Sequence, residues 1–571
     1  MTATIHSIVK LTRRNARERA LYASNTPPPS QLDGRRIGGF WRGLRVLCAA
    51  GLTAKSLAAV VVAVGVAFRL FGADIDFRPP CVVPAPMEMS YQADVAVRLD
   101  DAVVFRVACS DAKAVGWVCD KAKAWWGVAG ESRFAAAAED ENAQTALPPG
   151  EESYALSAKP GRIEISASSL QGVRYAMYTL RQIAERESSG SALKGYWLPA
   201  LEIKDAPLLA FRGIHLCWWP EMPNGFVERQ IRLAAYYKFN CVVLESWGVF
   251  KSERHPQFAA KDAPLSVAEA GRLAALASDL GVVIVPQVNV FGHATSARSC
   301  TGKHSTLDFH PEMQPLFEPA GGWNWCLSNP DATAVLRDYV DEVHEAFARP
   351  PFFHIGCDEA DPPSCPKCRA SKPYGKLVAA HISSVCDILK KRGARAMMWH
   401  DMLIKKGDGR WKGFYAHGTD ELDGLIEVIP KDVVVCDWYY GSDPGGQDKT
   451  GGETITAQFP TLDYFAASGF DVVTCPWRSV KGIAAQCAYA REKKLFGVLE
   501  TVWHHFRGTE FADMAMASAN GAWRGGKTGK CGKWTTPFAV HWRQLGWDMD
   551  VKDYSATGYY NSQVTREILD R

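Results

Sequence analysis

Two adjacent carboxylates, Asp358 and Glu359, follow the apolar segment Phe352-Phe353-His354-Ile355, which has the composition of a buried strand. Cleavage of a glycosidic bond needs an acid that protonates the leaving oxygen and a negative group that stabilises positive charge at the anomeric carbon. Because neighbouring side chains at a strand end point in different directions, the two carboxylates can serve different parts of one sugar. That arrangement suits a mechanism in which the substrate supplies the nucleophile. An isolated Asp-Glu pair is equally compatible with two solvated carboxylates that open a loop.

The pair Cys365-Pro-Lys-Cys368 is the one tight spacing among 16 cysteines. Two such pairs would indicate a zinc site. A single pair indicates a local knuckle or disulfide, or a metal site completed by Cys357 or Cys386. The other cysteines are scattered, which argues against a disulfide scaffold. We predict no metal and no cofactor for the reaction.

Length and charge limit the function classes. The 571 residues exceed one ordinary domain, and 47% of them are apolar, as in globular proteins with large cores. The net charge is only +3. This balance favours neither a nucleic-acid platform nor a funnel for acidic substrates.

The N-terminal region, residues 1–73, has the composition of a leader. It is basic, and it contains the uninterrupted apolar run Ser56 to Phe68. Positive charge ahead of a run of this length is typical of a signal peptide or a membrane anchor. We therefore expect export to the periplasm or the exterior, either as a free protein or anchored to the membrane through this segment.

Two folded units are expected after the leader. Residues 81–205 combine short alternating segments with one amphipathic helix, which predicts a small α+β domain. From residue 207 to 545 apolar strands alternate with helices, and residues 546–571 form a tail. The candidate strands begin near Phe211, Asn240, Val282, Phe352, Ala394, Val433, Phe470 and Leu495.

Eight strands with helical spacers predict a (β/α)₈ barrel, whose active site lies at the C-terminal ends of its strands. A doubly wound α/β fold is the main competitor, but no glycine-rich nucleotide loop follows the first strand. The helices have recognisable ends. Ser266 and Glu269 form a capping box, Gly281 ends that helix, and Asn329-Pro330 opens another.

The sequence HIGCDE, residues 354–359, resembles the His-x-Gly-Gly-Asp-Glu signature of the family 20 glycoside hydrolases, the β-N-acetylhexosaminidases. Other segments occur in the order and spacing of that family. They are Val82-Val83-Pro84-Ala85-Pro86, Tyr154 to Glu185, Phe211-Arg212-Gly213, Tyr237-Lys238-Phe239-Asn240 and Phe291-Gly292-His293. The resemblance covers roughly residues 81 to 510 and implies a retaining enzyme that removes terminal N-acetylhexosamine from glycans.

The resemblance also implies a role for each matching residue. Glu359 would be the general acid and then the general base, and Asp358 would orient the acetamido group that attacks the anomeric carbon. Arg212 would hold hydroxyls of the terminal sugar. His293 and His354 would contact the sugar or support the groups that do.

Three tryptophans, Trp399, Trp438 and Trp503, stand at the ends of the fifth, sixth and eighth predicted strands. The resemblance implies that they wall the sugar pocket. Any single tryptophan is more often part of a core, but three at separate strand ends favour a site.

The chain departs from the family pattern around this site. Cys357 replaces the second glycine of the signature, Cys217 stands where the family has an aspartate, and Leu244-Glu245-Ser246-Trp247 replaces a His-x-x-Asp pattern. His504-His505 replaces a glutamate. The chain is therefore expected to be a divergent member.

The tyrosine that the family uses to hold the acetamido carbonyl is missing at the seventh strand, where Cys475-Pro476-Trp477-Arg478 stands. Tyr439 or Tyr440, at the sixth strand, could replace it. Without such a group the barrel would be a carbohydrate-binding protein that has lost turnover. A third reading is a related glycosidase for a sulfated or galacto-configured sugar, which Arg478 and His504-His505 would suit.

Overall fold

The computed structural model describes residue 77, residues 79–526 with nine gaps, and residues 541 and 545. The gaps are 101, 137–146, 187–194, 221, 261–262, 296–305, 320, 442–458 and 504–507. The chain divides into two compact units, Met1–Asp74 and Ile75–Arg571, and every described residue belongs to the second. The predicted leader, the tail and His504-His505 lie outside the described residues. No helix in the described ranges has the length and apolar character that a membrane crossing needs.

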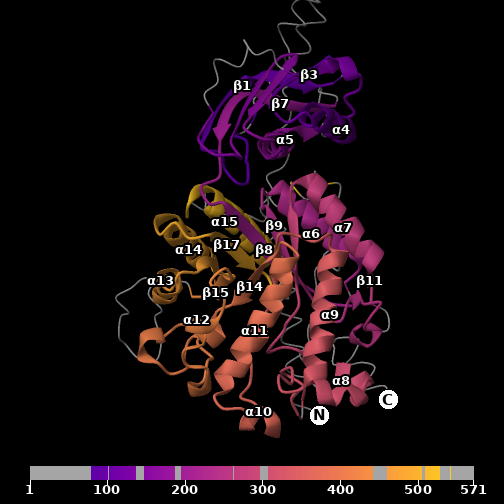
Figure 1. The fold of residues 1–571 in the computed structure, drawn as a ribbon. Helices are drawn as coiled ribbons and strands as arrows, with labels where there is room; N and C mark the ends of the chain where they lie inside the picture. Colours follow the sequence, from indigo (N-terminus) through magenta and orange to yellow (C-terminus); the bar gives the residue numbers. More distant parts are fainter. Residues whose placement is uncertain are drawn as a thin grey trace, which may run out of the picture. The chain divides into compact units, whose positions relative to one another are not determined.

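A mixed sheet forms the first part of the described chain. Its strands follow the order β1 (Glu88–Leu99), β7 (Tyr196–Asp205), β4 (Tyr154–Lys159), β5 (Arg162–Ala167), β2 (Val104–Ala108) and β3 (Phe134–Ala136), with β6 (Glu185–Arg186) beside β7. Helices α4 (Ala114–Trp126) and α5 (Leu170–Ile183) pack on one face of it (Figure 1). Strand β5 alternates strictly, with Ile163 and Ile165 buried. Alternation of this kind gives the sheet one apolar face, and the helices cover it.

Eight parallel strands then close into a barrel, which confirms the predicted fold class. In ring order they are β8 (Phe211–Trp218), β9 (Cys241–Ser246), β12 (Val283–Gln287), β13 (Phe352–His354), β14 (Arg395–Trp399), β15 (Val434–Trp438), β16 (Asp471–Cys475) and β17 (Gly497–Thr501). Pairing of β17 with β8 closes the ring, with Val498 opposite Arg212. Each predicted strand start lies within two residues of an observed one.

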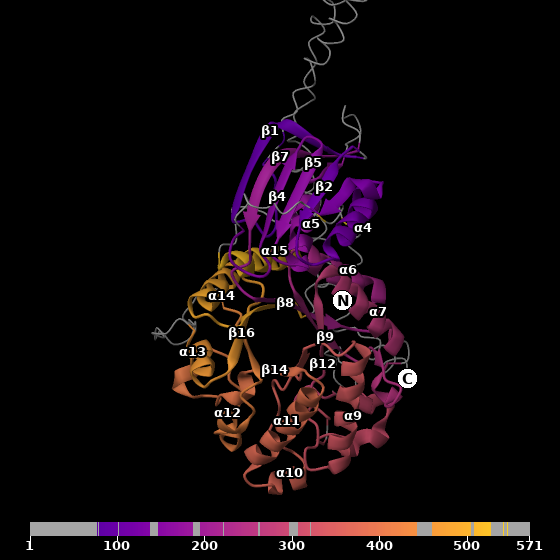
Figure 2. The same ribbon diagram turned by 45° about the horizontal axis from the view of Figure 1, so that its top comes forward.

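Helices surround the ring of strands, as Figure 2 shows. They are α6 (Asn224–Tyr236), α7 (Val267–Leu280), α9 (Pro330–Ala346), α11 (Tyr374–Lys391), α12 (Leu425–Val428), α13 (Pro460–Ala467), α14 (Val480–Glu492) and α15 (Gly508–Arg524). Shorter elements lie in the loops: β10 (Phe250–Lys251), β11 (Leu265–Ser266), α8 (Thr306–Phe309), α10 (Pro366–Ala370) and the 3₁₀ turns η1 (Glu131–Arg133), η3 (Pro256–Phe258), η4 (Pro311–Leu316), η5 (Asp401–Leu403), η6 (Gly409–Trp411) and η7 (Asp420–Leu422).

The predicted helix ends are confirmed. The Ser266 hydroxyl accepts a hydrogen bond from the backbone N–H of Glu269, and Gly281 ends α7 in the left-handed conformation with φ 79°. Asn329 caps α9 by accepting from the backbone N–H of Asp331. These caps fix where each helix starts and therefore where the preceding loop leaves the barrel.

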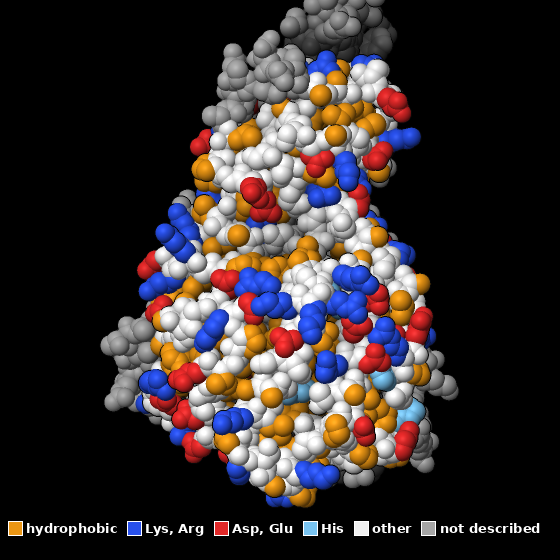
Figure 3. Space-filling view, in the orientation of Figure 1, with side chains coloured by type: hydrophobic (Ala, Val, Ile, Leu, Met, Phe, Trp, Pro, Cys, Tyr) orange, Lys and Arg blue, Asp and Glu red, His pale blue; other side chains and the backbone are white. Residues whose placement is uncertain are grey.

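The barrel interior is filled by apolar side chains. Phe211, Val285, Met397, Trp399 and Leu499 belong to one buried cluster inside the ring. A filled interior leaves only the loop ends of the strands for a site. On the face seen in Figure 3, basic and acidic side chains are interspersed over the helices, in keeping with the small net charge of +3.

Candidate active site

A pocket of about 690 Å³, part of it open to solvent, lies at the C-terminal ends of the barrel strands. Its volume is in the range of small-molecule sites. The lining comes from strand ends or from loops that follow strands. It consists of Cys217, Glu245, Trp247, His293, Asp358, Glu359, Trp438, Tyr440, Trp477 and Trp503.

Asp358 and Glu359 lie side by side in this pocket but in different surroundings. Strand β13 ends at His354, and the chain then passes through Gly356 (φ 65°), Cys357 (φ 76°) and Glu359 (φ 45°) in left-handed conformations. This turn separates the two carboxylates: the Asp358 side chain is 10% exposed, and that of Glu359 is 46% exposed. One carboxylate is thus shielded and the other faces the open space of the pocket.

His293 bridges the two carboxylates. Its Nε2 lies 3.2 Å from Asp358 Oδ2 and 3.3 Å from Glu359 Oε2. The preceding Gly292 allows this approach, because a Cβ there would lie 2.1 Å from the backbone oxygen of Asp358. The loop after β12 and the loop after β13 are therefore in direct backbone contact, and that contact sets where the imidazole stands.

The backbone of Glu359 is held from two sides. Its N–H donates to Oδ2 of the buried Asp401, at 2.9 Å, and its carbonyl accepts from the indole N–H of Trp323, at 2.7 Å. Asp401 also accepts from Nδ1 of His417, at 2.9 Å, and from the indole N–H of Trp438, at 3.3 Å. These bonds restrict the direction in which the Glu359 side chain leaves the backbone.

The hydrogen bond to Asp401 raises the pKa of His417 above its usual value; burial lowers it, but the negative charges of Asp401 and Glu359 add to the rise. An imidazolium at this position would place positive charge beside the carboxylates of Asp401 and Glu359.

A second polar group lines the pocket. Glu245, 3% exposed, accepts from Nδ2 of Asn289 at 2.8 Å and lies 3.2 Å from Nε2 of His215. Glu245 Oε2, the oxygen that His215 contacts, also accepts a hydrogen bond from the thiol of Cys217, at 3.4 Å. Glu245 is thus a fixed hydrogen-bond acceptor at the pocket wall.

Aromatic rings form the remaining walls. Trp438 stacks on Tyr415, with ring centroids 4.2 Å apart, and on Tyr440, at 5.2 Å. Trp477 meets Tyr440 edge-on at 5.0 Å, and the indole N–H of Trp503 donates to the Tyr440 hydroxyl at 2.9 Å. Flat aromatic faces of this kind pack well against the C–H surfaces of a sugar ring.

The structure distinguishes the two tyrosines that the sequence left as alternatives. Tyr440 lines the pocket, whereas Tyr439 is buried between Phe414 and Phe459. Burial and the neighbouring Cys475 thiol raise the pKa of Tyr440 well above its usual value, although hydrogen bonds with Trp503 and Thr501 act against this. Its hydroxyl therefore stays protonated and can donate to a ligand oxygen.

Two residues that the resemblance placed at the sugar are fully buried: Trp399 does not wall the pocket, and His354 is left with the supporting role, the second of the two expected for it. His354 is 0% exposed, and its Nδ1 accepts from the backbone N–H of Gly356. Burial and the nearby His215 lower its pKa to about 3, so the ring is neutral. Trp399, also 0% exposed, packs between His354 and Trp503 inside the barrel, with ring centroids 4.4 and 5.6 Å away. Both support the pocket from the barrel interior without reaching it.

The prediction for Arg212 is also wrong. Arg212 is the second residue of β8, at the N-terminal end of the strand, and it is 1% exposed. Its guanidinium donates to both carboxylate oxygens of Glu152, to the Tyr175 hydroxyl and to the backbone carbonyls of Leu209 and Lys238. With its donors engaged at the opposite end of the strand, it is a structural ion-pair residue.

Several residues of the site were not selected from the sequence. Glu245, Trp247 and Trp477 each follow or end a predicted strand, so their position was a usable signal. Asp401 offered a weaker one, two residues after the end of β14. Trp323 lies in a loop far from any strand end, and nothing in the local sequence marks it.

Two groups of side chains in the described ranges have a spacing that a metal could bridge. One is His215, Cys217 and Glu245 in the pocket wall, whose atoms already hydrogen-bond one another. The other is Cys326, Cys365 and Cys368. The sequence suggested Cys357 or Cys386 as an additional metal ligand beside Cys365 and Cys368, but neither belongs to a group. The third thiol of this group is Cys326.

Two family models match this chain. Residues 79–206 match the model described as glycosyl hydrolase family 20, domain 2, and residues 229–504 match glycosyl hydrolase family 20, catalytic domain. Strand β8, which carries His215 and Cys217, lies between the two matches.

Among curated proteins, the chain is 23% identical over 373 residues to a beta-hexosaminidase of Porphyromonas gingivalis, a match that covers 56% of this chain and 45% of the relative. It is 28% identical over 269 residues to a beta-N-acetylhexosaminidase of Cellulomonas fimi, covering 43% of this chain and 50% of the relative. The chain thus spans about half the length of the curated relatives it matches.

Solved structures share the fold. An exo beta-N-acetylglucosaminidase of Vibrio harveyi, in complex with N-acetylglucosamine, superposes with a TM-score of 0.57 at 18% identity, covering 82% of this chain and 78% of that one. A beta-N-acetylhexosaminidase of Bacteroides fragilis gives 0.57 at 19% identity, covering 77% and 90%. With both domain models matched in order across most of its length, the chain belongs to glycosyl hydrolase family 20, as a divergent member.

Proposed function

We propose that this protein is a retaining exo-β-N-acetylhexosaminidase in which the acetamido group of the substrate is the nucleophile. The observation that carries the proposal is the shared contact of His293 with two adjacent carboxylates, one shielded and one open to the pocket. Two carboxylates on opposite sides of a bond would suit an enzyme that supplies its own nucleophile or activates water. Two carboxylates on the same side of the bond leave no protein group to attack the anomeric carbon from the other side, so a group on the sugar must do so.

The reaction then follows from the two environments. The protonated carboxyl of Glu359 gives its proton to the leaving oxygen while the acetamido oxygen bonds to the anomeric carbon, and the bond to the leaving group breaks. The carboxylate of Asp358 accepts a hydrogen bond from the amide N–H and stabilises the positive charge of the oxazolinium ring. Water next attacks the anomeric carbon and gives a proton to the carboxylate of Glu359, while the bond between the anomeric carbon and the acetamido oxygen breaks and the acetamido group is restored.

Tyr440 is the group that we assign to the acetamido carbonyl. Its protonated hydroxyl lies in the pocket wall, and the Trp503 indole N–H already fixes its position at 2.9 Å. A donor at the carbonyl oxygen aligns that oxygen for attack. This assignment removes the main reason for regarding the barrel as a binding protein without turnover.

The charge of the pocket favours a neutral sugar over a sulfated one. Its lining includes the three carboxylates Asp358, Glu359 and Glu245, and none of the described lining residues is Lys or Arg. The carboxylates of Asp358 and Glu245 would repel a sulfate, whereas Glu245 can accept hydrogen bonds from sugar hydroxyls. The names of the relatives, two hexosaminidases and an exo beta-N-acetylglucosaminidase, support the same substrate class.

The proposal is tested by comparing 4-nitrophenyl N-acetyl-β-D-glucosaminide with 4-nitrophenyl β-D-glucoside, which lacks the acetamido group. We expect turnover of the first and no measurable turnover of the second. Glu359→Gln should lower kcat on the first by about 10²–10⁴-fold, the usual contribution of general acid–base catalysis. Glu492→Gln, on the exposed surface of α14, is the matched control and should retain full activity. Equal turnover of both glycosides, or an active Glu359→Gln variant, would refute the proposal.

A further inference from the structure

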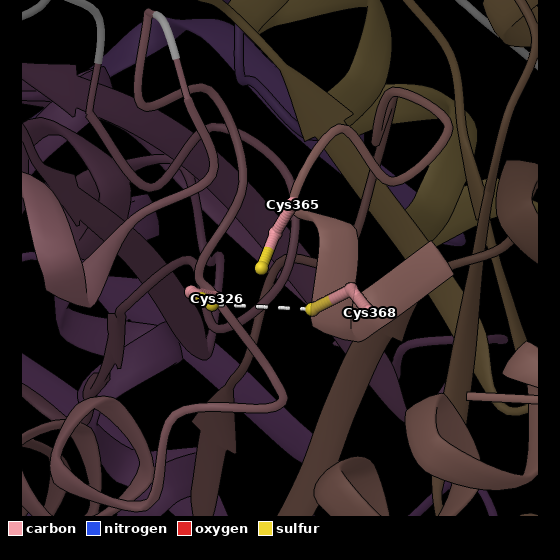
Figure 4. Close-up of side chains that lie close together, drawn as sticks. All are labelled: Cys326, Cys365 and Cys368. Atoms are coloured by element: carbon pink, nitrogen blue, oxygen red, sulfur yellow. Dashed lines mark hydrogen bonds between the residues drawn. The ribbon is translucent and has the colours of Figure 1, made fainter. Parts of the chain in front are cut away.

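Three cysteine side chains converge outside the pocket, next to the loop that follows the catalytic carboxylates. Cys326 lies in the loop before α9, Cys365 precedes α10, and Cys368 lies in α10; Figure 4 shows their sulfurs pointing toward one another. All three sulfurs lie within 4.8 Å of one another, and those of Cys326 and Cys368 are 3.9 Å apart.

These distances match metal coordination. Two thiolates bound to one tetrahedral zinc ion, with Zn–S bonds of about 2.3 Å, lie about 3.8 Å apart. A disulfide needs about 2.05 Å between the sulfurs and would leave the third thiol of the cluster unused. Cys326 and Cys368 are 6% and 0% exposed, and Cys365 is partly exposed, so the cluster lies at the edge of the buried interior.

A buried carboxylate lies beside the three thiols and is the candidate for a fourth ligand. Glu318 is 4% exposed, and its Oε2 accepts hydrogen bonds from the backbone N–H groups of Ser364 and Cys365 and from the Ser364 hydroxyl. Its side chain is also a hydrogen-bond partner of Cys368. The second oxygen, Oε1, is buried and makes no hydrogen bond to any residue of the described ranges. A buried carboxylate oxygen without a donor is costly unless a cation occupies the site beside it.

We propose that Cys326, Cys365, Cys368 and Glu318 bind one structural Zn²⁺ ion. Zinc is the metal that such a donor set favours, because thiolates select soft or borderline metals and a closed set of four protein ligands suits tetrahedral Zn²⁺. Ser328, whose hydroxyl lies 3.1 Å from the Cys368 sulfur, can donate a hydrogen bond to a bound thiolate.

The ion would join the loop that contacts Glu359 to the segment that follows Glu359 in the chain. The loop that carries Cys326 also carries Trp323, whose indole N–H donates to the Glu359 carbonyl. It carries Asn324 too, which exchanges hydrogen bonds with the backbone of Asp361 at 2.7 and 3.1 Å. A metal bound between this loop and α10 would keep these contacts in register without taking part in the reaction.

The test measures metal rather than activity, so it stands whether or not the proposed reaction is correct. The full chain is purified without chelator from zinc-supplemented cells, and its zinc content is measured by mass spectrometry. We expect about one zinc per chain. Replacing the zinc with Co²⁺ should give the intense thiolate-to-cobalt absorption of a tetrahedral site. Cys326→Ser and Cys368→Ser should lose both signals, and Cys386→Ser, a buried thiol on α11, should keep them.

If a cysteine variant fails to fold, removal of the metal from the wild-type chain with a chelator, followed by titration with Zn²⁺ or Co²⁺, gives the same information. Two results would overturn the proposal. One is a wild-type chain without zinc that takes up no Co²⁺ with a thiolate absorption band. The other is a disulfide among the three cysteines in protein alkylated at lysis.

Discussion

At the scale of single residues, two neighbouring carboxylates of the site differ in their surroundings, and the proposed mechanism assigns them different roles. Asp358 is shielded against His293, and Glu359 has nearly half of its side chain exposed toward the pocket. The sequence could predict this pair because an apolar strand ending in Asp-Glu is a local pattern. It could not predict His293 as their bridge, because that contact needs the backbone of Gly292 against the backbone of Asp358.

The division of roles predicts different responses to the leaving group. kcat/KM is measured on aryl N-acetyl-β-glucosaminides whose phenols differ in pKa. The wild type should depend weakly on the phenol, since Glu359 protonates it. Glu359→Gln should depend steeply on it, because the phenolate must leave without a proton. Asp358→Asn should lower every rate but keep the weak dependence. Matching slopes for the two variants would contradict the assignment.

The hydroxyl of Tyr440 is predicted to act on the acetamido carbonyl. Tyr440→Phe should lower kcat/KM on an N-acetylglucosaminide by about 100-fold, as the loss of one positioned donor does. Tyr439→Phe is the matched control, since that ring packs between Phe414 and Phe459 outside the pocket. Equal effects of the two substitutions, measured by steady-state kinetics, would show that Tyr440 has no such role.

At the scale of elements, the site depends on how loops from different strands meet. The eight strands could be predicted because apolar runs alternate with capped helices. The contacts among their loops could not, because Trp323 and Glu359 are 36 residues apart and no local pattern connects them. The position of Arg212 could have been predicted, because the sequence already placed it second in its strand, at the end away from the site. At about 3.3 Å per residue it lies about 20 Å from the strand end near Trp218.

The close approach of Gly292 to Asp358 is predicted to be essential. In Gly292→Ala the new Cβ would lie 2.1 Å from the Asp358 backbone oxygen, so one of the two loops must move. A displacement of about 1 Å at a catalytic group can cost about 100-fold in rate, and we expect a loss of at least that size in kcat. Gly271→Ala, on α7 with no atom nearer than 3.7 Å, should leave kcat unchanged. Normal activity in a folded Gly292→Ala variant would contradict this geometry.

At the scale of the whole molecule, buried polar contacts join the sheet domain to the barrel. Arg212 pairs with Glu152, and Lys238 lies 3.2 Å from Asp205 with both side chains 0% exposed. The indole N–H of Trp523, in α15, donates to the same aspartate at 2.8 Å. The first part of the chain therefore supports the barrel at the N-terminal ends of its strands, away from the pocket.

Arg212→Met tests this structural role. Removing one partner of a buried ion pair destabilises a protein by about 3 to 5 kcal/mol, because the other charge stays buried and unpaired. We expect a loss of this size in the free energy of unfolding from denaturant titration, and an unchanged KM for the folded variant at low temperature. A raised KM with unchanged stability would instead restore Arg212 to the substrate site.

The proposed mechanism requires the acetamido oxygen of the sugar to attack the anomeric carbon. The most direct measurement is kcat on 4-nitrophenyl glucosaminides whose N-acetyl group carries zero, one, two or three fluorine atoms. Fluorine withdraws electron density from the carbonyl oxygen and weakens it as a nucleophile without changing the leaving group. We expect kcat to fall steeply with each added fluorine. A kcat that does not depend on fluorination would contradict the mechanism.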